Sequence, residues 1–331
     1  FPSFGKMAAL TLLRKAQIQL KRLEKALREK SEEFDSVIKM GRTQLQDAVP
    51  IRLGQEFHAY ASAISRDIKR FDTAKEEIRS LNMGGTAIGT GLNADSTYFH
   101  RVVKNMSSIT GEELVQSYDT IDATQNLDSY AMVSGIVKSC AVNLSKMCND
   151  LRLMSSGPRT GFCEINLPAK QNGSSIMPGK INPVIPEVVN QVAFNIIGND
   201  VTITMAAEAG QLELNAFEPI IFYNLFESIQ TLSNAVQTLV DNCIVGITAN
   251  EEHCRKMVEG SIGIITAICP YVGYETAANI AKEALRTNNS VRDLILQKKL
   301  LTEEQLKTIL DPYTMTKPGI QGRNPADLLA D

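Results

Sequence analysis

The sequence lacks the features of a membrane protein, a nucleic-acid-binding protein or a zinc protein. No run approaches the ~20 uninterrupted apolar residues of a membrane span. The formal net charge of −3 gives no basic surface for nucleic acid. The six cysteines are scattered without a CxxC pair, which indicates reduced, packed thiols in a cytoplasmic protein. The three histidines lie far apart, and none belongs to a metal-ligand pattern such as HExxH.

The amino end has none of the features of a processed or targeted start. Residues 1–4 include no initiator Met, no basic n-region and no apolar signal-peptide core. A strongly helical pattern begins within a few residues. We therefore expect a chain cut out of something longer.

Apolar residues recur at heptad-like spacing from Lys6 to Met40, with charged residues on the other faces. One row consists of Leu13, Leu20, Leu27 and Phe34. A second row, three residues further on, consists of Ala16, Leu23 and Val37. This spacing predicts a long amphipathic helix that packs against other long helices.

Similar patterns predict helices at about 53–81, 97–109, 124–154, 183–209 and 219–247. After about Asn250 the segments become short, and Thr302–Gln305 has the pattern of a capping box. Alternation of β-branched residues is scarce. The sequence therefore predicts an all-α protein, with a long-helix bundle domain at 1–252 and a small helical C-terminal domain at 253–331.

The most unusual stretch is Gly173-Ser174-Ser175-Ile176-Met177-Pro178-Gly179-Lys180-Ile181-Asn182-Pro183. It combines two serine hydroxyls, glycines on both sides, a lysine and a helix start. Asn182 is a good N-cap, Pro183 a good first helical residue, and Glu187 an acid in the first turns. A helix start beside Lys180 suits a carboxylate, and the loop can carry Ser174 onto a bound anion as a lid does. A solvated Ser/Gly linker is the alternative.

Two further stretches interrupt the helices. Gly41–Pro50 is a turn crowded with hydrogen-bonding side chains, for which helix capping is the alternative explanation. The glycine-rich stretch 84–93 indicates a loop. No Lys-Ser/Thr follows this loop and no strand precedes it, so a nucleotide site is not expected.

The order of residues in 173–183 resembles the signature loop of the aspartase/fumarase superfamily. Gly41–Pro50 and Gly84–Asn93 resemble two other segments of that family, and the resemblance covers essentially the whole chain. Val184–Gln191 and Ala206–Gly210 look more like aspartases than fumarases. One position departs from many members, because Gln44 stands where they carry His.

The resemblance implies reversible removal of ammonia from L-aspartate to give fumarate. Ser174 would be the base that takes the β-proton, and Ser175 would donate to the resulting aci-carboxylate. The other carboxylate would be held by Thr43, Lys180 and Asn182. Gln44 would lie near the amino group, and Glu187 would support the site from behind. The chemistry needs no metal or organic cofactor, although activation by a divalent cation stays open.

The resemblance also implies a homotetramer in which each site takes residues from three subunits. Family members carry an amino-terminal domain ahead of the first long helix, and we expect it to be absent here. The chain by itself is then expected to be inactive on aspartate. Two other functions stay open, a class II fumarase that interconverts malate and fumarate and a non-catalytic scaffold derived from a truncated lyase.

Overall fold

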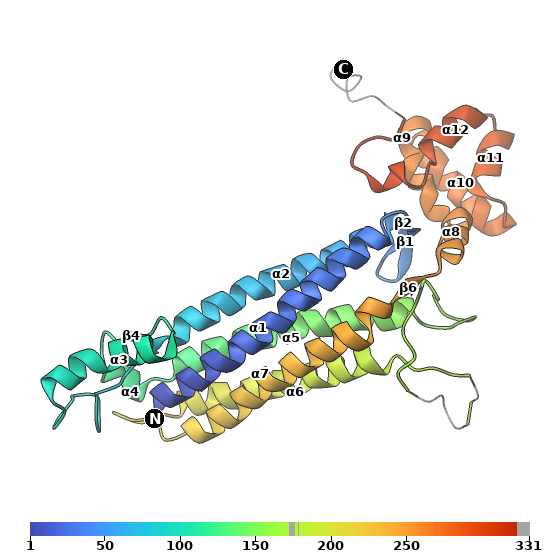
Figure 1. The fold of residues 1–331 in the computed structure, drawn as a ribbon. Helices are drawn as coiled ribbons and strands as arrows, with labels where there is room; N and C mark the ends of the chain where they lie inside the picture. Colours follow the sequence, from blue (N-terminus) through green and yellow to red (C-terminus); the bar gives the residue numbers. More distant parts are fainter. Residues whose placement is uncertain (172–175, 178, 323–331) are drawn as a thin grey trace, which may run out of the picture. The chain divides into compact units, whose positions relative to one another are not determined.

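The computed structural model describes residues 1–171, 176–177 and 179–322. The chain is mainly helical, and its β structure in these ranges consists of short two-stranded sheets and an isolated bridge between Gln211 and Leu214 (Figure 1). The all-α fold class predicted from the sequence is therefore confirmed. Within the described ranges, the structure contains no helix long and apolar enough to span a bilayer.

The long helices and their short companions occupy the first three quarters of the chain. They are α1 (Pro2–Glu33), α2 (Leu53–Ile78), α3 (Ser96–Thr110), α4 (Asp122–Gln125), α5 (Asp128–Met154), α6 (Val184–Glu208) and α7 (Glu218–Asn242). The later segments are η1 (Ile244–Gly246), α8 (Glu251–Gly260), η2 (Ile262–Ala267), α9 (Cys269–Val272), α10 (Tyr274–Thr287), α11 (Val291–Gln297), α12 (Glu303–Ile309) and η3 (Thr314–Thr316).

The strands form three pairs. β1 (Ile38–Thr43) and β2 (Gln46–Arg52) are antiparallel, as are β5 (Ile165–Asn166) and β6 (Thr248–Ala249). β3 (Ser80–Leu81) and β4 (Val115–Gln116) are parallel.

The chain divides into two compact units. Unit 1 comprises residues 1–26, 60–153 and 167–246, and unit 2 comprises 27–59, 154–166 and 247–331. Each unit is assembled from segments that are distant in the sequence. The domains predicted at 1–252 and 253–331 are continuous, and that division stays a prediction about domain organisation.

In unit 1, side-chain hydrogen bonds link five long helices in cyclic order. The linked pairs are Gln17 with Asp72 (α1–α2), Asn143 with Asp67 (α2–α5), Ser134 with Asp200 (α5–α6), Asn199 with Ser228 (α6–α7) and Arg22 with Asp241 (α7–α1). The predicted heptad row of α1 faces inward, because Leu13, Leu20 and Leu23 are fully buried. The bundle is therefore held by apolar rows, and polar links join neighbouring helices.

The prediction that the first helix continues to Met40 is wrong. Helix α1 ends at Glu33, and residues 38–43 form strand β1. The carbonyl of Phe34 accepts from the backbone nitrogen of Gly54, at the start of α2, at 3.0 Å. In a longer helix this carbonyl would accept a hydrogen bond from within the helix instead. Phe34 and Val37 are still buried, as the heptad spacing predicts, although neither is helical.

The carboxy-terminal segments of unit 2 pack around their own apolar cluster. Its buried members are Ile268, Ile280, Ala284, Val291, Leu294, Ile295, Leu306 and Ile309. The predicted capping box is confirmed, because Thr302 accepts from the backbone of Gln305 while the Gln305 side chain accepts from the backbone of Thr302. These short helices therefore share one apolar cluster.

Candidate active site

Thr43 and Gln44 lie at the tip of the β1–β2 hairpin in unit 2. Thr43 pairs with Gln46, which leaves Gln44 and Leu45 as a two-residue connection. Both predicted substrate-binding side chains are exposed. The segment predicted as a crowded turn is thus a β-hairpin that presents these side chains to solvent.

The hairpin turn adopts an unusual backbone conformation. Gln44 and Leu45 have φ values of 54° and 62°, and two consecutive left-handed residues are typical of a type I′ turn. Asn-Gly is the usual sequence for this turn, whereas side chains such as Gln and Leu cost of order 1–3 kcal/mol each in this region. The strained turn therefore depends on the strands that flank it.

A buried ion-pair network lies beside strand β1. Glu164 is fully buried, and one carboxylate oxygen accepts from the Arg42 guanidinium at 2.7 Å. The other oxygen lies 3.2 Å from the Lys39 ammonium, which also donates to Glu56 at 3.0 Å. The Glu164 carboxylate thus pairs with two cations of strand β1, and Glu56 pairs with one of them, Lys39.

The segment around Glu164 is fixed by further contacts. Cys163 has a φ of 47°, and its carbonyl accepts from the Asn250 side chain at 2.8 Å. Burial raises the pKa of the Cys254 thiol to about 12, so the thiol keeps its proton. It donates to the Glu164 carbonyl at 3.6 Å. Two residues that follow β6 therefore hold the backbone that carries Glu164.

The signature stretch belongs to unit 1. Ser174, Ser175, Gly173 and Pro178 lie outside the described residues. Lys180 is exposed, and its backbone nitrogen donates to Met177 at 3.2 Å. Gly179 has a φ of 82°, a conformation that favours glycine. The chain thus turns sharply immediately before Lys180.

Helix α6 begins one residue later than predicted. Its N-cap is Pro183, which makes no side-chain cap, so the prediction that Asn182 caps the helix is wrong. Asn182 is half-buried, and its carbonyl accepts from the Val184 nitrogen at 2.9 Å. Proline has no hydrogen-bonding side chain, and the turn at Asn182 uses its backbone instead. Glu187 lies in the first turn as predicted and pairs with Arg152 at 3.7 Å.

The predicted site residues thus fall into two groups. Thr43 and Gln44 share the hairpin tip of unit 2, while Lys180, Asn182 and Glu187 lie around the start of α6 in unit 1. Each group is compact in its own unit, as their closeness in the sequence requires.

The glycine-rich stretch 84–93 forms a loop, as predicted. Its glycines at 84, 89 and 91 all have positive φ. A Cβ on Gly89 would lie 2.3 Å from the Ile121 Cα, so close backbone packing accounts for this glycine. The Gly89 carbonyl accepts from the Thr120 hydroxyl at 2.6 Å. The loop therefore has a packing role. The prediction that no strand precedes it is wrong, because the short strand β3 (Ser80–Leu81) lies immediately ahead of it.

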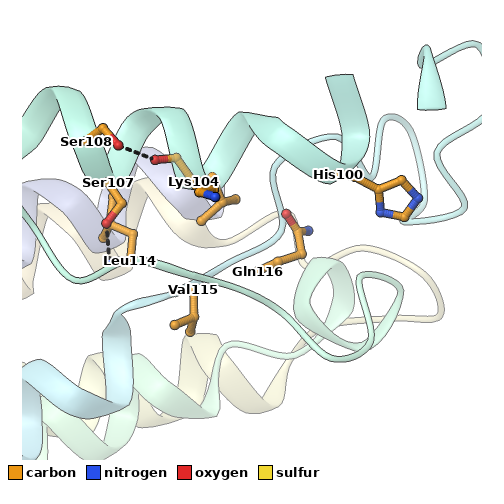
Figure 2. Close-up of a pocket in the computed structure, with 8 residues that line it drawn as sticks. His100, Lys104, Ser107, Ser108, Leu114, Val115 and Gln116 are labelled. Atoms are coloured by element: carbon orange, nitrogen blue, oxygen red, sulfur yellow. Dashed lines mark hydrogen bonds between the residues drawn. The ribbon is translucent and has the colours of Figure 1, made fainter. Parts of the chain in front are cut away.

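A cavity of about 330 Å³ lies beside α3 and β4 in unit 1 (Figure 2). His100, Lys104 and Gln116 contribute to its lining. Two of its lining residues are engaged locally, because the Ser108 hydroxyl donates to the Lys104 carbonyl at 3.1 Å and the Gln116 amide donates to the Met83 carbonyl at 3.1 Å. The cavity contains none of the predicted substrate-binding residues.

The described part of the chain contains no cluster of three His, Cys, Asp or Glu side chains arranged to hold a metal ion. The six cysteines are free, and Cys140, Cys148, Cys243 and Cys254 are buried. Burial keeps these four in the thiol form, because it raises the pKa of each.

Sequence reasoning missed the residues of the ion-pair network. Glu164 follows Phe162 and Cys163 and precedes Ile165, so it is an acid in a largely apolar stretch. A buried acid needs a cation, and Lys39 and Arg42 lie more than a hundred residues away in the sequence. The apolar neighbours of Glu164 could therefore have indicated that this acid is buried. They do not indicate which cations pair with it.

Comparison with known proteins identifies the class. The lyase family matches residues 6–198, and the fumarase C carboxy-terminal family matches residues 264–317. Aspartate ammonia-lyase from Bacillus subtilis is 54% identical over 323 residues, which are 98% of this chain and 68% of that protein. These matches define a lyase built on long helices.

Solved structures agree with this class. Fumarate lyase:delta crystallin from Brucella melitensis, bound to cobalt, has a TM-score of 0.92 and 48% identity over 96% of this chain and 69% of that one. Class II fumarase from Schistosoma mansoni has a TM-score of 0.90 and 31% identity over 95% of this chain and 70% of that one. The chain belongs to the aspartase/fumarase family of lyases, as its signature stretch predicts.

Proposed function

We propose that this protein catalyses the reversible deamination of L-aspartate to fumarate and ammonia. The observation that carries this is the identity of more than half of its residues to an aspartate ammonia-lyase across nearly the whole chain. Aspartate ammonia-lyases from Helicobacter pylori are similar to the same degree. A four-carbon dicarboxylate is therefore the substrate class.

The difficult step is removal of a proton from the carbon beside the side-chain carboxylate. The C–H electron pair moves into that carboxylate, which becomes an aci-carboxylate with an extra negative charge. Collapse of this intermediate forms the C=C bond and breaks the C–N bond, and the leaving nitrogen departs as ammonia. The site must therefore stabilise charge that develops on the carboxylate.

Ser174 is the proposed base, and its Oγ takes the proton. A serine hydroxyl acts as a base when its alkoxide is stabilised by backbone amides, by a cation such as Lys180 and by exclusion of water. Ser175 donates to the aci-carboxylate. The proposed role requires the stretch that carries Ser174 to cover the bound substrate.

The remaining residues hold the substrate. Thr43, Lys180 and Asn182 bind the second carboxylate, and Gln44 lies near the amino group. The exposure of Thr43, Gln44 and Lys180 supports these roles, because a binding side chain must be reachable. Glu187 supports the site through its pairing with Arg152.

We propose that copies of this chain assemble into a homotetramer in which three subunits contribute to each site. An apolar stripe on α6 supports assembly. Phe194, Ile197, Val201 and Met205 recur at helical spacing, and they are 62%, 37%, 58% and 64% exposed. Such a stripe indicates a protein-protein interface. Light scattering should give a tetramer, and Phe194→Glu should give smaller species.

We place the protein in the cytoplasm and assign no metal or organic cofactor to the reaction. The free thiols support a reducing compartment. Addition of a chelator should leave turnover unchanged under this scheme, and activation by a divalent ion would show up as loss of rate with chelator and recovery with the metal.

The function is tested by an absorbance assay of fumarate formation with the full-length protein. Aspartate and malate are supplied as substrates in separate reactions. We expect turnover of aspartate and none of malate. Turnover of malate alone identifies a fumarase, and the absence of both activities in a folded tetramer indicates a scaffold.

Lys180→Ala tests the binding role. We expect a higher KM for aspartate with a smaller change in kcat, because the lost contact holds a carboxylate that does not react. An unchanged KM contradicts the assignment.

A further inference from the structure

We propose that Glu164 is a positioning residue for this reaction, and that it fixes the hairpin tip which carries Thr43 and Gln44. The inference rests on the proposed function, because those two side chains are its substrate-binding groups. Glu164 does not itself contact substrate. It acts through strand β1.

One carboxylate anchors the strand at two points. Glu164 accepts from Arg42 at 2.7 Å and pairs with Lys39 at 3.2 Å, and both cations belong to β1 (Ile38–Thr43). Arg42 is the residue immediately before Thr43. Because Glu164 is fully buried, water screens these interactions little. A shift of the carboxylate therefore moves the strand that ends at the tip.

The strand is built to bring both cations to one side. Residues three apart on a regular strand point to opposite faces, so Lys39 and Arg42 should not reach the same carboxylate. The pairing of β1 with β2 shifts register between Met40 and Arg42. Such an irregularity redirects side chains. Gly41 lies at this point, where a Cβ would be 2.6 Å from the Val49 carbonyl.

The anchor is also stiff. The Arg42 guanidinium lies 4.2 Å from the centre of the Phe162 ring, which restrains its plane. The Phe162 carbonyl is bound by His253 at 2.9 Å, and Cys163 is held in a left-handed conformation. Backbone strain of this kind persists where the surrounding structure imposes it. Residues 162–164 thus restrain the Arg42 side chain through the Phe162 ring and the Glu164 carboxylate.

Loss of the Glu164 charge should loosen the tip while the hairpin remains. Lys39 keeps its hydrogen bond to Glu56 at 3.0 Å, and Arg42 keeps its hydrogen bond to the Met40 carbonyl at 3.3 Å. The strained Gln44–Leu45 turn depends on its flanking strands. Substrate binding is therefore the property that should change.

The test is Glu164→Gln in the full-length protein, with steady-state kinetics on aspartate. We expect KM to rise on the order of 10- to 100-fold, the effect of misplacing a binding group by about 1 Å, with a smaller change in kcat. Asp67→Asn is the matched control. Asp67 is likewise fully buried and accepts from Arg70 at 2.8 Å, but it lies in the helical bundle. The control should lower the melting temperature without raising KM.

Arg42→Lys is the second variant, for the case in which Glu164→Gln does not fold. It keeps the charge but loses the planar fork and the stacking on Phe162. KM should rise in the same direction by a smaller factor. The double variant should raise KM by less than the product of the single effects, because both changes break one contact.

An active enzyme whose KM is unchanged in either folded variant overturns the positioning role and leaves the proposed function standing. An equal rise in KM for Asp67→Asn also overturns it, since general destabilisation then explains the effect. A wild-type protein without activity on aspartate or malate overturns the proposed function, and the positioning role with it.

Discussion

The helical bundle of unit 1 and the hairpin of unit 2 are stabilised by different means. In the bundle, rows of Leu side chains such as Leu13 and Leu20 are fully buried, and hydrogen bonds join neighbouring helices. In the hairpin, a buried carboxylate and two cations support a turn with strained φ values. Apolar packing tolerates small changes of side chain, whereas removal of one partner of a buried ion pair strongly lowers the stability of the fold. The hairpin should therefore be the more sensitive region to single polar substitutions.

The largest effect is expected for Lys39→Met in the hairpin. Lys39 is 3% exposed and pairs with Glu56 and Glu164, so its removal takes away one of the two cations that face the fully buried Glu164 carboxylate. The free energy of unfolding should fall by about 3–5 kcal/mol in urea titrations. Lys146→Met, which removes an exposed ammonium paired with Asp150, is the control and should change stability little. Equal effects from both variants contradict the importance of the buried charge.

Leu20→Ala breaks the bundle instead. Leu20 is fully buried in α1, and truncation leaves a cavity that should cost about 2–5 kcal/mol. The KM for aspartate should stay unchanged, in contrast to the hairpin variants. Ile18→Ala on the same helix is the control, because Ile18 is 58% exposed. A change in KM with Leu20→Ala shows that the two regions are not separable in this way.

Glu218→Gln sharpens the comparison, because Glu218 is a buried acid in the bundle. Burial raises its pKa from 4.5 to about 7, and its Oε1 has no hydrogen-bond partner in the described part of the chain. The folded state holds the proton more tightly, so its stability falls as pH rises from about 4.5 to about 7. Above pH 7 the variant should be more stable than the wild type by about 1–3 kcal/mol.

The difference in stability between Glu218→Gln and the wild type should vanish below about pH 4.5. There, Glu218 is protonated in both the folded and the unfolded wild-type protein. Melting curves across this range measure it. A variant that is less stable than the wild type at pH 8 contradicts the destabilising role of the Glu218 charge, and shows that the bundle depends on that charge.

The smallest effect is expected for Thr302→Ala in the carboxy-terminal helices of unit 2. The change removes the side-chain cap of α12 and should cost about 1 kcal/mol, with no change in KM. Thr302→Ser keeps the hydroxyl and should restore most of the loss. A loss as large as that of Lys39→Met shows that local capping matters as much as buried charge.

The features that the sequence predicts correctly are those encoded by neighbouring residues. The helical bundle follows from heptad spacing, the capping box from Thr302 and Gln305, and the loop at 84–93 from its glycines. The hairpin was missed because its strands depend on pairing, and its support comes from Glu164, 122 residues after Arg42. The N-cap of α6 was misplaced by one residue, because side-chain preference favours Asn182, whereas the helix begins after Pro183 without a side-chain cap. The site residues themselves came from family resemblance and not from periodicity.

Turnover of aspartate by Ser174→Ala in the full-length protein tests the central claim most directly. If Ser174 takes the β-proton, kcat should fall by about 10²- to 10⁴-fold while the helical circular dichroism stays the same. A folded variant that converts aspartate to fumarate at nearly the wild-type rate would contradict the account.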